Sequence, residues 1–178
     1  MTDPDRVPPT ALIVAIPAAE PVIGQHRAHL NANAALGVPA HVTVLFPFAP
    51  VSRLDEAQMS RLRDLFAAVP AFDILLDRTA WFGTSVLWLG PKDPAPFRDL
   101  TSRVFAAFPE FPPYEGRFDD VVPHLTVGED GPVDEMRRVE VAIAWQLPVL
   151  DRVTAVTLMA ESSRGGQWAT RASFPLEV

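Results

Sequence analysis

The chain has 178 residues, of which 48% are hydrophobic and 21% are charged, and this balance is typical of a folded globular protein and excludes a disordered one. The net charge of -7 argues against capture of long polynucleotides, because that binding depends on many contacts between phosphates and basic side chains. The sequence contains no cysteine, so disulfides, thiolate nucleophiles, zinc–cysteine sites and iron–sulfur clusters are excluded.

The opening stretch MTDPDRVPPT carries acidic residues and prolines where a signal peptide would have a basic start and an apolar core. No apolar run approaches the ~18 residues that a membrane span requires. We therefore expect a cytoplasmic protein that does not associate with membranes.

The first half of the chain predicts a set of three strands and two helices. ALIVAI (11–16) is a β-branched strand, a helix-compatible stretch runs from 21 to about 35, and HVTVLF (41–46) is the second strand. A helix with an apolar stripe begins near Ser52, and a third strand covers roughly 72–82. The predicted order is therefore β-α-β-α-β.

The second half repeats this order. Its predicted elements are a strand over 85–90, a helix from Asp93, a strand around 124–127, a helix from Pro132, a long strand over 149–160 and an edge strand over 168–176. We predict an α+β fold in one domain over residues 1–178, with pseudo-repeats at approximately 11–82 and 85–160. The sequence leaves open whether strands exchange between the two halves.

The middle strand of each half carries a histidine and a threonine two residues apart. They are His41 and Thr43 in PAHVTVLFPF, and His124 and Thr126 in VPHLTVG. Because successive side chains of a strand point to opposite faces, each pair shares one face, with its members ~6 to 7 Å apart. At this composition a histidine is followed by apolar-Thr-apolar with a chance of ~0.01, so two such motifs among four histidines are expected about once in a thousand.

Two such histidines suit displacement at phosphorus. An imidazole titrates near ~6.5, so one ring can accept a proton from the attacking water or hydroxyl while the other donates one to the departing oxygen. The threonine hydroxyls would donate hydrogen bonds to the non-bridging oxygens as negative charge builds up. This arrangement needs no metal and no other cofactor.

The paired H-x-T-apolar motifs resemble those of the two-histidine (2H) phosphoesterase superfamily, which includes the bacterial 2'-5' RNA ligase-like proteins. The resemblance covers most of the chain and implies a duplicated, monomeric two-lobe fold, with mostly antiparallel sheets lining a central cleft and helices outside. It implies an RNA-processing hydrolase that acts on cyclic phosphates or 2'-5' phosphodiesters of nucleotides or RNA ends. Carried over residue by residue, it implies that His41 and His124 are the acid–base pair and that Thr43 and Thr126 are the phosphate ligands.

Substrate specificity is expected to come from the end of the first motif and from the loop 108–123. Phe46 matches the aromatic residue that often follows the first motif in this family, whereas at Phe48 the chain lacks the glycine-containing turn of many ligase-like members. In the loop, Tyr114 can stack on a base and Arg117 can pair with a phosphate, unless both merely lie on the surface of a proline-stiffened connection. The four tryptophans are interpreted as core or lobe-interface aromatics.

Three other interpretations remain open. The two motifs can be buried strands whose polar side chains are satisfied structurally. The same cleft can also serve a non-catalytic nucleotide-binding regulatory module. Finally, His26 and His29 share a helix face with Asn33 one turn further on, and a metal-dependent hydrolase would use this pair, although no third ligand is evident nearby and solvated helix surface is the simpler explanation.

Overall fold

The computed structural model describes residues 8–118, 120–163 and 165–178. Residues 1–7, which belong to the stretch that argued against a signal peptide, lie outside the described residues. Across the described ranges, no helix is both long enough and apolar enough to cross a membrane.

The predicted order of strands and helices is confirmed. The strands are β1 (Thr10–Ala15), β2 (His41–Phe48), β3 (Phe72–Phe82), β4 (Val86–Pro91), β5 (Leu125–Glu129), β6 (Val149–Val153), β7 (Ala155–Glu161) and β8 (Trp168–Pro175). The helices are α1 (Glu20–Leu30), α2 (Ala32–Ala35), α3 (Glu56–Ala67), α4 (Ala95–Ala107) and α5 (Val133–Ala144), with short 3-10 turns η1 (Pro17–Ala19), η2 (Val51–Arg53) and η3 (Pro113–Gly116).

Three elements differ from the prediction. The helix predicted to begin near Ser52 is α3, which begins at Glu56 and is capped by Asp55. The first predicted helix is broken at Asn31, whose backbone is extended and whose side-chain oxygen accepts a hydrogen bond from the Asn33 N–H, which caps α2. The long strand predicted over 149–160 is interrupted at Thr154, and its two parts, β6 and β7, belong to different sheets.

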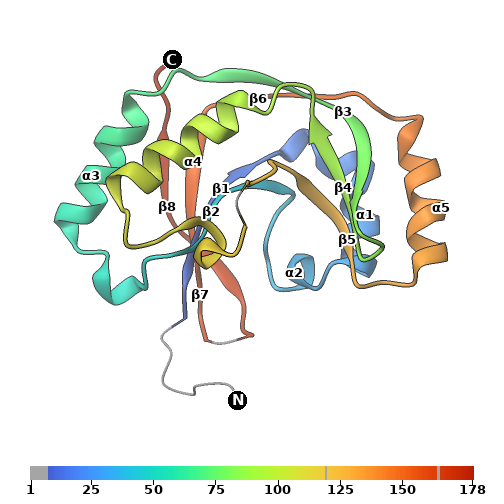
Figure 1. Cartoon of the computed structure of the whole chain (residues 1–178), viewed down its shortest axis with the longest axis horizontal. Coiled ribbons are helices and arrows are strands. Elements are labelled where there is room, and N and C mark those ends of the chain that lie inside the picture. Colours follow the sequence, from blue (N-terminus) through green and yellow to red (C-terminus); the bar gives the residue numbers. More distant parts are fainter. Residues whose placement is uncertain (1–7, 119, 164) are drawn as a thin grey trace.

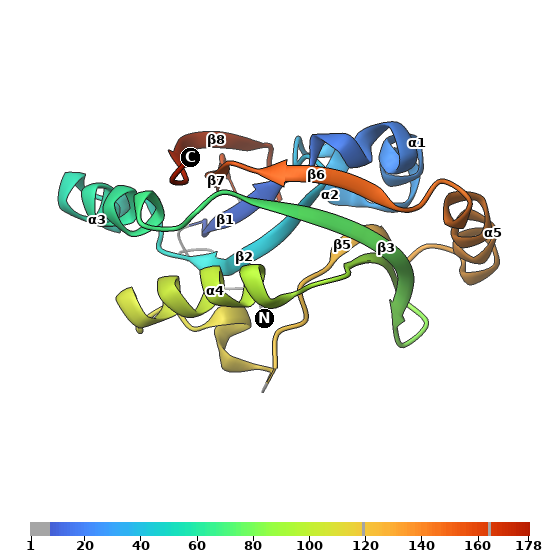
Figure 2. The same cartoon turned by 90° about the horizontal axis from the view of Figure 1, so that it is seen from above.

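The strands form two antiparallel four-stranded sheets, with the orders β2-β1-β7-β8 and β5-β4-β3-β6. Strands do exchange between the sequence halves, because β3 pairs with β4 and β6, and β7 pairs with β1. Figure 2 shows β3 and β6 side by side as the strands that cross between the lobes. The extent of the two pseudo-repeats stays a prediction.

The helices exchange in the same way. The helix α4 packs on β2 and α3 on β8, whereas α1 packs on β5 and α5 on β3. In Figure 1, α3 and α4 therefore lie on the left and α1 and α5 on the right. Each half of the sequence thus contributes its first helix to the opposite lobe, which confirms a mixed, two-lobe fold with its helices outside.

The two motifs lie on β2, which begins at His41, and on β5, which begins one residue after His124. Both are edge strands, and they contact each other across the lobes. Val42, Leu125 and Val127 are fully buried in a core that runs through both lobes. Burial of each such side chain stabilises the fold by about 1.5–3 kcal/mol, and a one-residue slip would instead bury the histidines and threonines. The register of both motifs is therefore set by the apolar residues that alternate with them.

Candidate active site

The four predicted catalytic residues line one cavity of about 260 Å³ between the lobes. Its lining comprises His41, Thr43, His124, Thr126, Tyr114, Glu129, Asn31, Asn33, Phe46, Trp168, Ala11, Ile13, Val38 and Met159. Residues 83 positions apart in the chain thus meet because the edge strands β2 and β5 face each other.

Both histidine rings are oriented by a backbone carbonyl two residues earlier. The Nδ1 atom of His41 lies 2.8 Å from the carbonyl oxygen of Pro39, and Nδ1 of His124 lies 2.7 Å from that of Val122. A carbonyl only accepts, so each Nδ1 carries the proton and each Nε2 is the nitrogen that can exchange a proton with a ligand. The two lobes therefore present the same tautomer.

Both rings favour the neutral state. Burial lowers the pKa of His41 to about 4, against the opposing effect of its bond to Pro39, and the Arg27 guanidinium and the His124 ring lower that pKa further. Burial also lowers the pKa of His124, opposed by its bond to Val122. With no anion bound, either ring can therefore act as a proton acceptor at neutral pH.

Tyr114 reaches the cavity from η3. Its backbone lies in the left-handed region, with φ 50° and ψ 34°, and Glu115 follows with φ 57°. Such values cost a bulky residue free energy and persist only where the surroundings enforce them. Burial raises the pKa of Tyr114, a hydrogen bond between its hydroxyl and the Thr43 side chain opposes this rise, and the Glu129 charge adds to it. A hydroxyl that keeps its proton at neutral pH therefore lies beside Thr43.

The structure brings Phe46 into the cavity but not Phe48. Phe46 lines the cavity and meets Trp168 edge to face, with ring centroids 6.2 Å apart. Phe48 is 2% exposed and packs in the core against Phe108 and Phe111. Phe48 points away from this cavity because the pairing of β2 with β1 is irregular on both sides of Leu12 and the alternation of side chains shifts there. Its role in substrate binding stays a prediction.

Arg117 does not line the cavity either. Its guanidinium is largely exposed and donates to the Glu115 carboxylate at 2.8 Å. The interpretation of this side chain as a surface residue therefore fits better than a role in phosphate binding. The tryptophans also differ in their surroundings. Trp88 is buried, Trp145 is exposed and Trp168 lines the cavity.

Several cavity residues were not singled out by the sequence as ligands of a substrate, namely Asn31, Glu129, Trp168 and the apolar residues of β1 and β7. The alternation of Ala11 and Ile13 with the core residue Leu12 does predict that they share a face. Tertiary structure determines whether that face lines the cavity or another surface, and the local sequence does not indicate which. The Asn33 side chain was noted only as a possible neighbour of a metal.

The metal-site alternative finds no ligand set in the described part of the chain. No group of three or more His, Asp or Glu side chains there could hold a metal ion. His29 is exposed on α1, and neither His26 nor His29 lines the cavity.

The fold and the site together define a class of protein in which two lobes each contribute an H-x-T strand to a shared cleft. A family model described as the 2'-5' RNA ligase superfamily matches residues 14–165. The chain belongs to this superfamily. No curated protein is similar enough to count as a match.

Solved structures share the fold at low sequence identity. The chain resembles E. coli LigT complexed with NADP+ (19% identity, TM-score 0.61, covering 97% of this chain and 100% of that one) and LigT complexed with 3'-AMP (20% identity, TM-score 0.60, covering 97% and 100%). It also resembles a protein of Thermus thermophilus (17% identity, TM-score 0.62, covering 94% and 97%). These likenesses support the two-lobe architecture.

Proposed function

We propose that the protein is a metal-independent phosphoesterase that hydrolyses a cyclic phosphate or a 2'-5' phosphodiester of a nucleotide or RNA end. The observation that carries the proposal is the equivalent orientation of His41 and His124, whose Nδ1–H groups are bound to carbonyls and whose rings line one cavity with Thr43 and Thr126. In-line displacement at phosphorus uses one proton acceptor and one proton donor on opposite sides of the phosphate.

The reaction follows from this geometry. One neutral imidazole takes a proton on Nε2 from water as the water oxygen bonds to phosphorus. The bond from phosphorus to a ribose oxygen breaks, and the other imidazole, protonated on Nε2, gives its proton to that oxygen. The hydroxyls of Thr43 and Thr126 donate hydrogen bonds to the non-bridging oxygens while the charge on them increases. The product is a phosphate monoester, or two separated nucleosides of which one carries the phosphate.

The charge of the bound phosphate also favours formation of the proton donor, which is one imidazole that takes up a proton from solvent. Among the described residues that line the cavity, none is Arg or Lys, and the pKa of each histidine is lowered mainly by burial. An anion placed beside two neutral imidazoles favours protonation of one of them. Substrate binding therefore converts a pair of neutral rings into one acid and one base.

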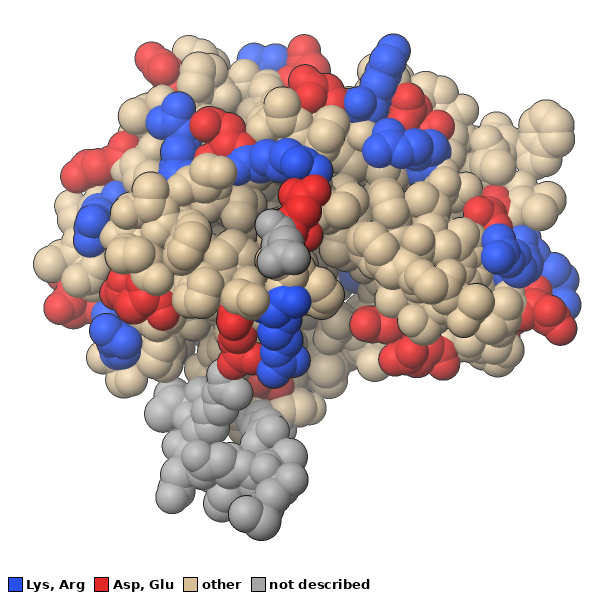
Figure 3. All heavy atoms as spheres, in the orientation of Figure 1, with Lys and Arg blue, Asp and Glu red and all other residues tan. Residues whose placement is uncertain are grey.

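The cavity suits a small substrate. Its volume of about 260 Å³ is below the ~300–1,000 Å³ typical of ligand pockets, so one nucleotide would fill it. Phe46 and Trp168 offer aromatic surface for a base, and LigT has been solved in complexes with NADP+ and 3'-AMP. On the face shown in Figure 3, basic side chains are interspersed with acidic ones, which disfavours a long polynucleotide.

A panel assay tests the proposal. The substrates are 2',3'-cyclic nucleotides, RNA ending in a cyclic phosphate and 2'-5' dinucleotides, each with EDTA present. We expect EDTA-resistant hydrolysis by the wild type and a loss of about 100-fold or more in His41→Ala and in His124→Ala, the scale for removal of a general acid or base.

The control is His29→Ala, the same substitution at an exposed histidine of α1, which should leave the rate unchanged. Full activity in both cavity variants would refute the mechanism. A wild type that binds nucleotides without turning them over would instead support the non-catalytic regulatory module.

A further inference from the structure

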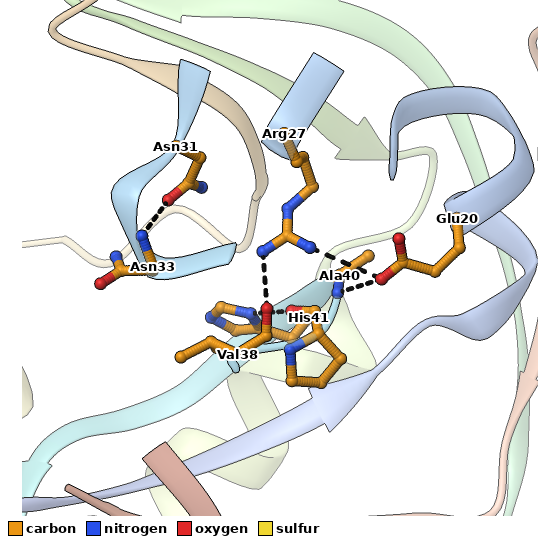
Figure 4. A network of polar contacts seen from close by, with 8 residues as sticks. Glu20, Arg27, Asn31, Asn33, Val38, Ala40 and His41 are labelled. Atoms are coloured by element: carbon orange, nitrogen blue, oxygen red, sulfur yellow. Dashed lines mark hydrogen bonds and ion pairs between the residues drawn. The ribbon is translucent and has the colours of Figure 1, made fainter. Parts of the chain in front are cut away.

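The loop that leads into β2 is held by two charged side chains of α1. The Arg27 side chain is 3% exposed, and one of its terminal nitrogens donates to the Val38 carbonyl at 3.1 Å. The Glu20 carboxylate accepts a hydrogen bond from the Ala40 N–H at 2.7 Å, and the same oxygen lies 3.5 Å from the other terminal nitrogen of Arg27. Figure 4 shows these contacts closing around the loop beside His41.

The two contacts flank the residue that orients His41. Pro39 lies between Val38 and Ala40, and its carbonyl oxygen accepts the hydrogen bond from His41 Nδ1. Fixing the carbonyl before Pro39 and the N–H after it restricts the peptide planes on both sides. The direction of the Pro39 carbonyl, and with it the direction of His41 Nε2, is therefore set by α1.

The same helix packs against the strand that follows His124. A Cβ atom on Gly128 would lie 3.0 Å from Leu30 Cβ, so the absence of a side chain at Gly128 lets α1 approach β5 closely. Arg27 and Leu30 are three residues apart and so lie on one face of α1. One rigid element thus contacts the His41 loop in one lobe and the strand of Thr126 in the other.

The burial of Arg27 has no evident value for stability. Its Nε atom has no hydrogen-bond partner among the described residues, and its closest carboxylate contact is long at 3.5 Å. A buried, incompletely paired guanidinium is costly, and an apolar side chain of similar volume is often at least as stable in such a position. The energetic cost of burying Arg27 therefore favours a role for this residue in the candidate active site and not in stabilising the core.

We propose that Glu20 and Arg27 are positioning residues that fix the direction of the His41 ring through the loop before it. The effect on turnover rests on the proposed function, whereas the effect on the ring does not. The titratable side chains that line the cavity together with His41 are Tyr114, His124 and Glu129. Outside the cavity lining, the Arg27 cation on α1 is close enough to affect the pKa of His41.

The test uses substitutions that separate the contacts. Glu20→Ala removes the acceptor for the Ala40 N–H, and Glu20→Gln restores an acceptor without the charge. Arg27→Gln removes the cation and keeps an amide that can donate to Val38. The matched control is the exposed pair Glu56 and Arg63 on α3, which has the same seven-residue spacing, tested as Glu56→Ala and Arg63→Gln.

Two readouts are measured on folded protein: kcat and KM for the best substrate of the panel, and the titration of each histidine ring by NMR. We expect Glu20→Ala and Arg27→Gln to lower kcat by about 10-fold with little change in KM, because misdirected reacting groups lose rate and not binding. Glu20→Gln should recover to within about 3-fold of the wild type, because its amide oxygen still accepts from Ala40. In Arg27→Gln the pKa of His41 should rise while that of His124 stays the same.

A kcat and a His41 titration that match those of the α3 controls in both Glu20→Ala and Arg27→Gln would overturn the proposal. If Arg27→Gln does not fold, the Glu20→Ala and Glu20→Gln pair decides on its own. If the wild type hydrolyses nothing, the proposed function fails, and the NMR readouts still decide this inference: an unchanged His41 ring in the Glu20 and Arg27 variants overturns it, and a change confined to His41 supports it.

Discussion

The His41 side and the His124 side of the cleft reach the same ring orientation with different surroundings. Each ring donates Nδ1–H to a carbonyl two residues earlier. On the first side, the charged residues of α1 hold the preceding loop. On the second side, the His124 ring lies edge to face against Phe82 at 4.8 Å and near Trp88 at 5.9 Å, measured between ring centroids.

This difference shows which properties of the two histidines come from the duplicated backbone and which come from the side chains around each ring. The backbone gives both lobes the strand and the carbonyl acceptor, and each motif adds a threonine two residues after its histidine. Burial is the main cause of the lowered pKa on both sides, and nearby Arg27 and His124 lower the pKa of His41 further. The two sides of the site are therefore alike in geometry and unlike in electrostatics.

The largest expected effect tests whether the two threonines are equivalent. Thr43→Val and Thr126→Val each replace a hydroxyl by a methyl of similar size, and each should lower kcat by about 100-fold, the scale for loss of one donor to the developing charge. Steady-state kinetics on the cyclic-phosphate substrate measures this loss. Thr43→Ser and Thr126→Ser keep the hydroxyl and are the matched controls. A loss at only one position would show that the symmetry of the cleft is structural and not catalytic.

A smaller effect concerns stability and pH. The pKa of His41 is about 4 in the folded protein and near 6.5 in the unfolded chain, so between these values the unfolded chain binds more protons. The stabilisation is therefore complete above pH 6.5 and is lost as the pH falls through 4. Between pH 7 and pH 4 the free energy of unfolding should fall more for the wild type than for His41→Gln, by up to about 3 kcal/mol.

Denaturant unfolding at pH 7, 5.5 and 4 measures this difference, and His29→Gln on the surface of α1 serves as the control. The His124→Gln variant extends the comparison between the two sides, because burial lowers the pKa of that ring as well. Parallel curves for the wild type and His41→Gln would show that the folded protein does not hold His41 in its neutral form.

Much of the site was predictable from the sequence because its determinants are local. Alternation along a strand places His41 with Thr43 and buries Val42, and the same rule applies to the second motif. The periodicity of apolar residues likewise predicted each main helix to within a few residues. What the pattern fixes is the face that a strand buries.

The other features of the fold and of the site depend on which segments pack together, and a local sequence pattern does not determine this. The exchange of β3 and β7 between sheets leaves no trace in hydrophobic periodicity, since either sheet would bury the same face of each strand. The opposite fates of Phe46 and Phe48 arise from pairing irregularities between β1 and β2, which shift the alternation. Nothing in the sequence distinguishes Arg27 from other helix residues, because its role depends on the contacts of α1 with the loop before β2 and with β5.

The smallest effect tests the aromatic surroundings of the second side. Phe82→Leu keeps apolar volume next to His124 and removes the edge-to-face contact with its ring. Aromatic pairs of this kind contribute about 0.5–1.5 kcal/mol beyond their buried area, so we expect a stability loss of that order and a fall in kcat of about 3-fold. The His124 pKa, followed by NMR, should rise as water gains access, while that of His41 stays the same. A change at His41 instead would mean that the two sides are coupled through the cleft and that their surroundings do not act independently.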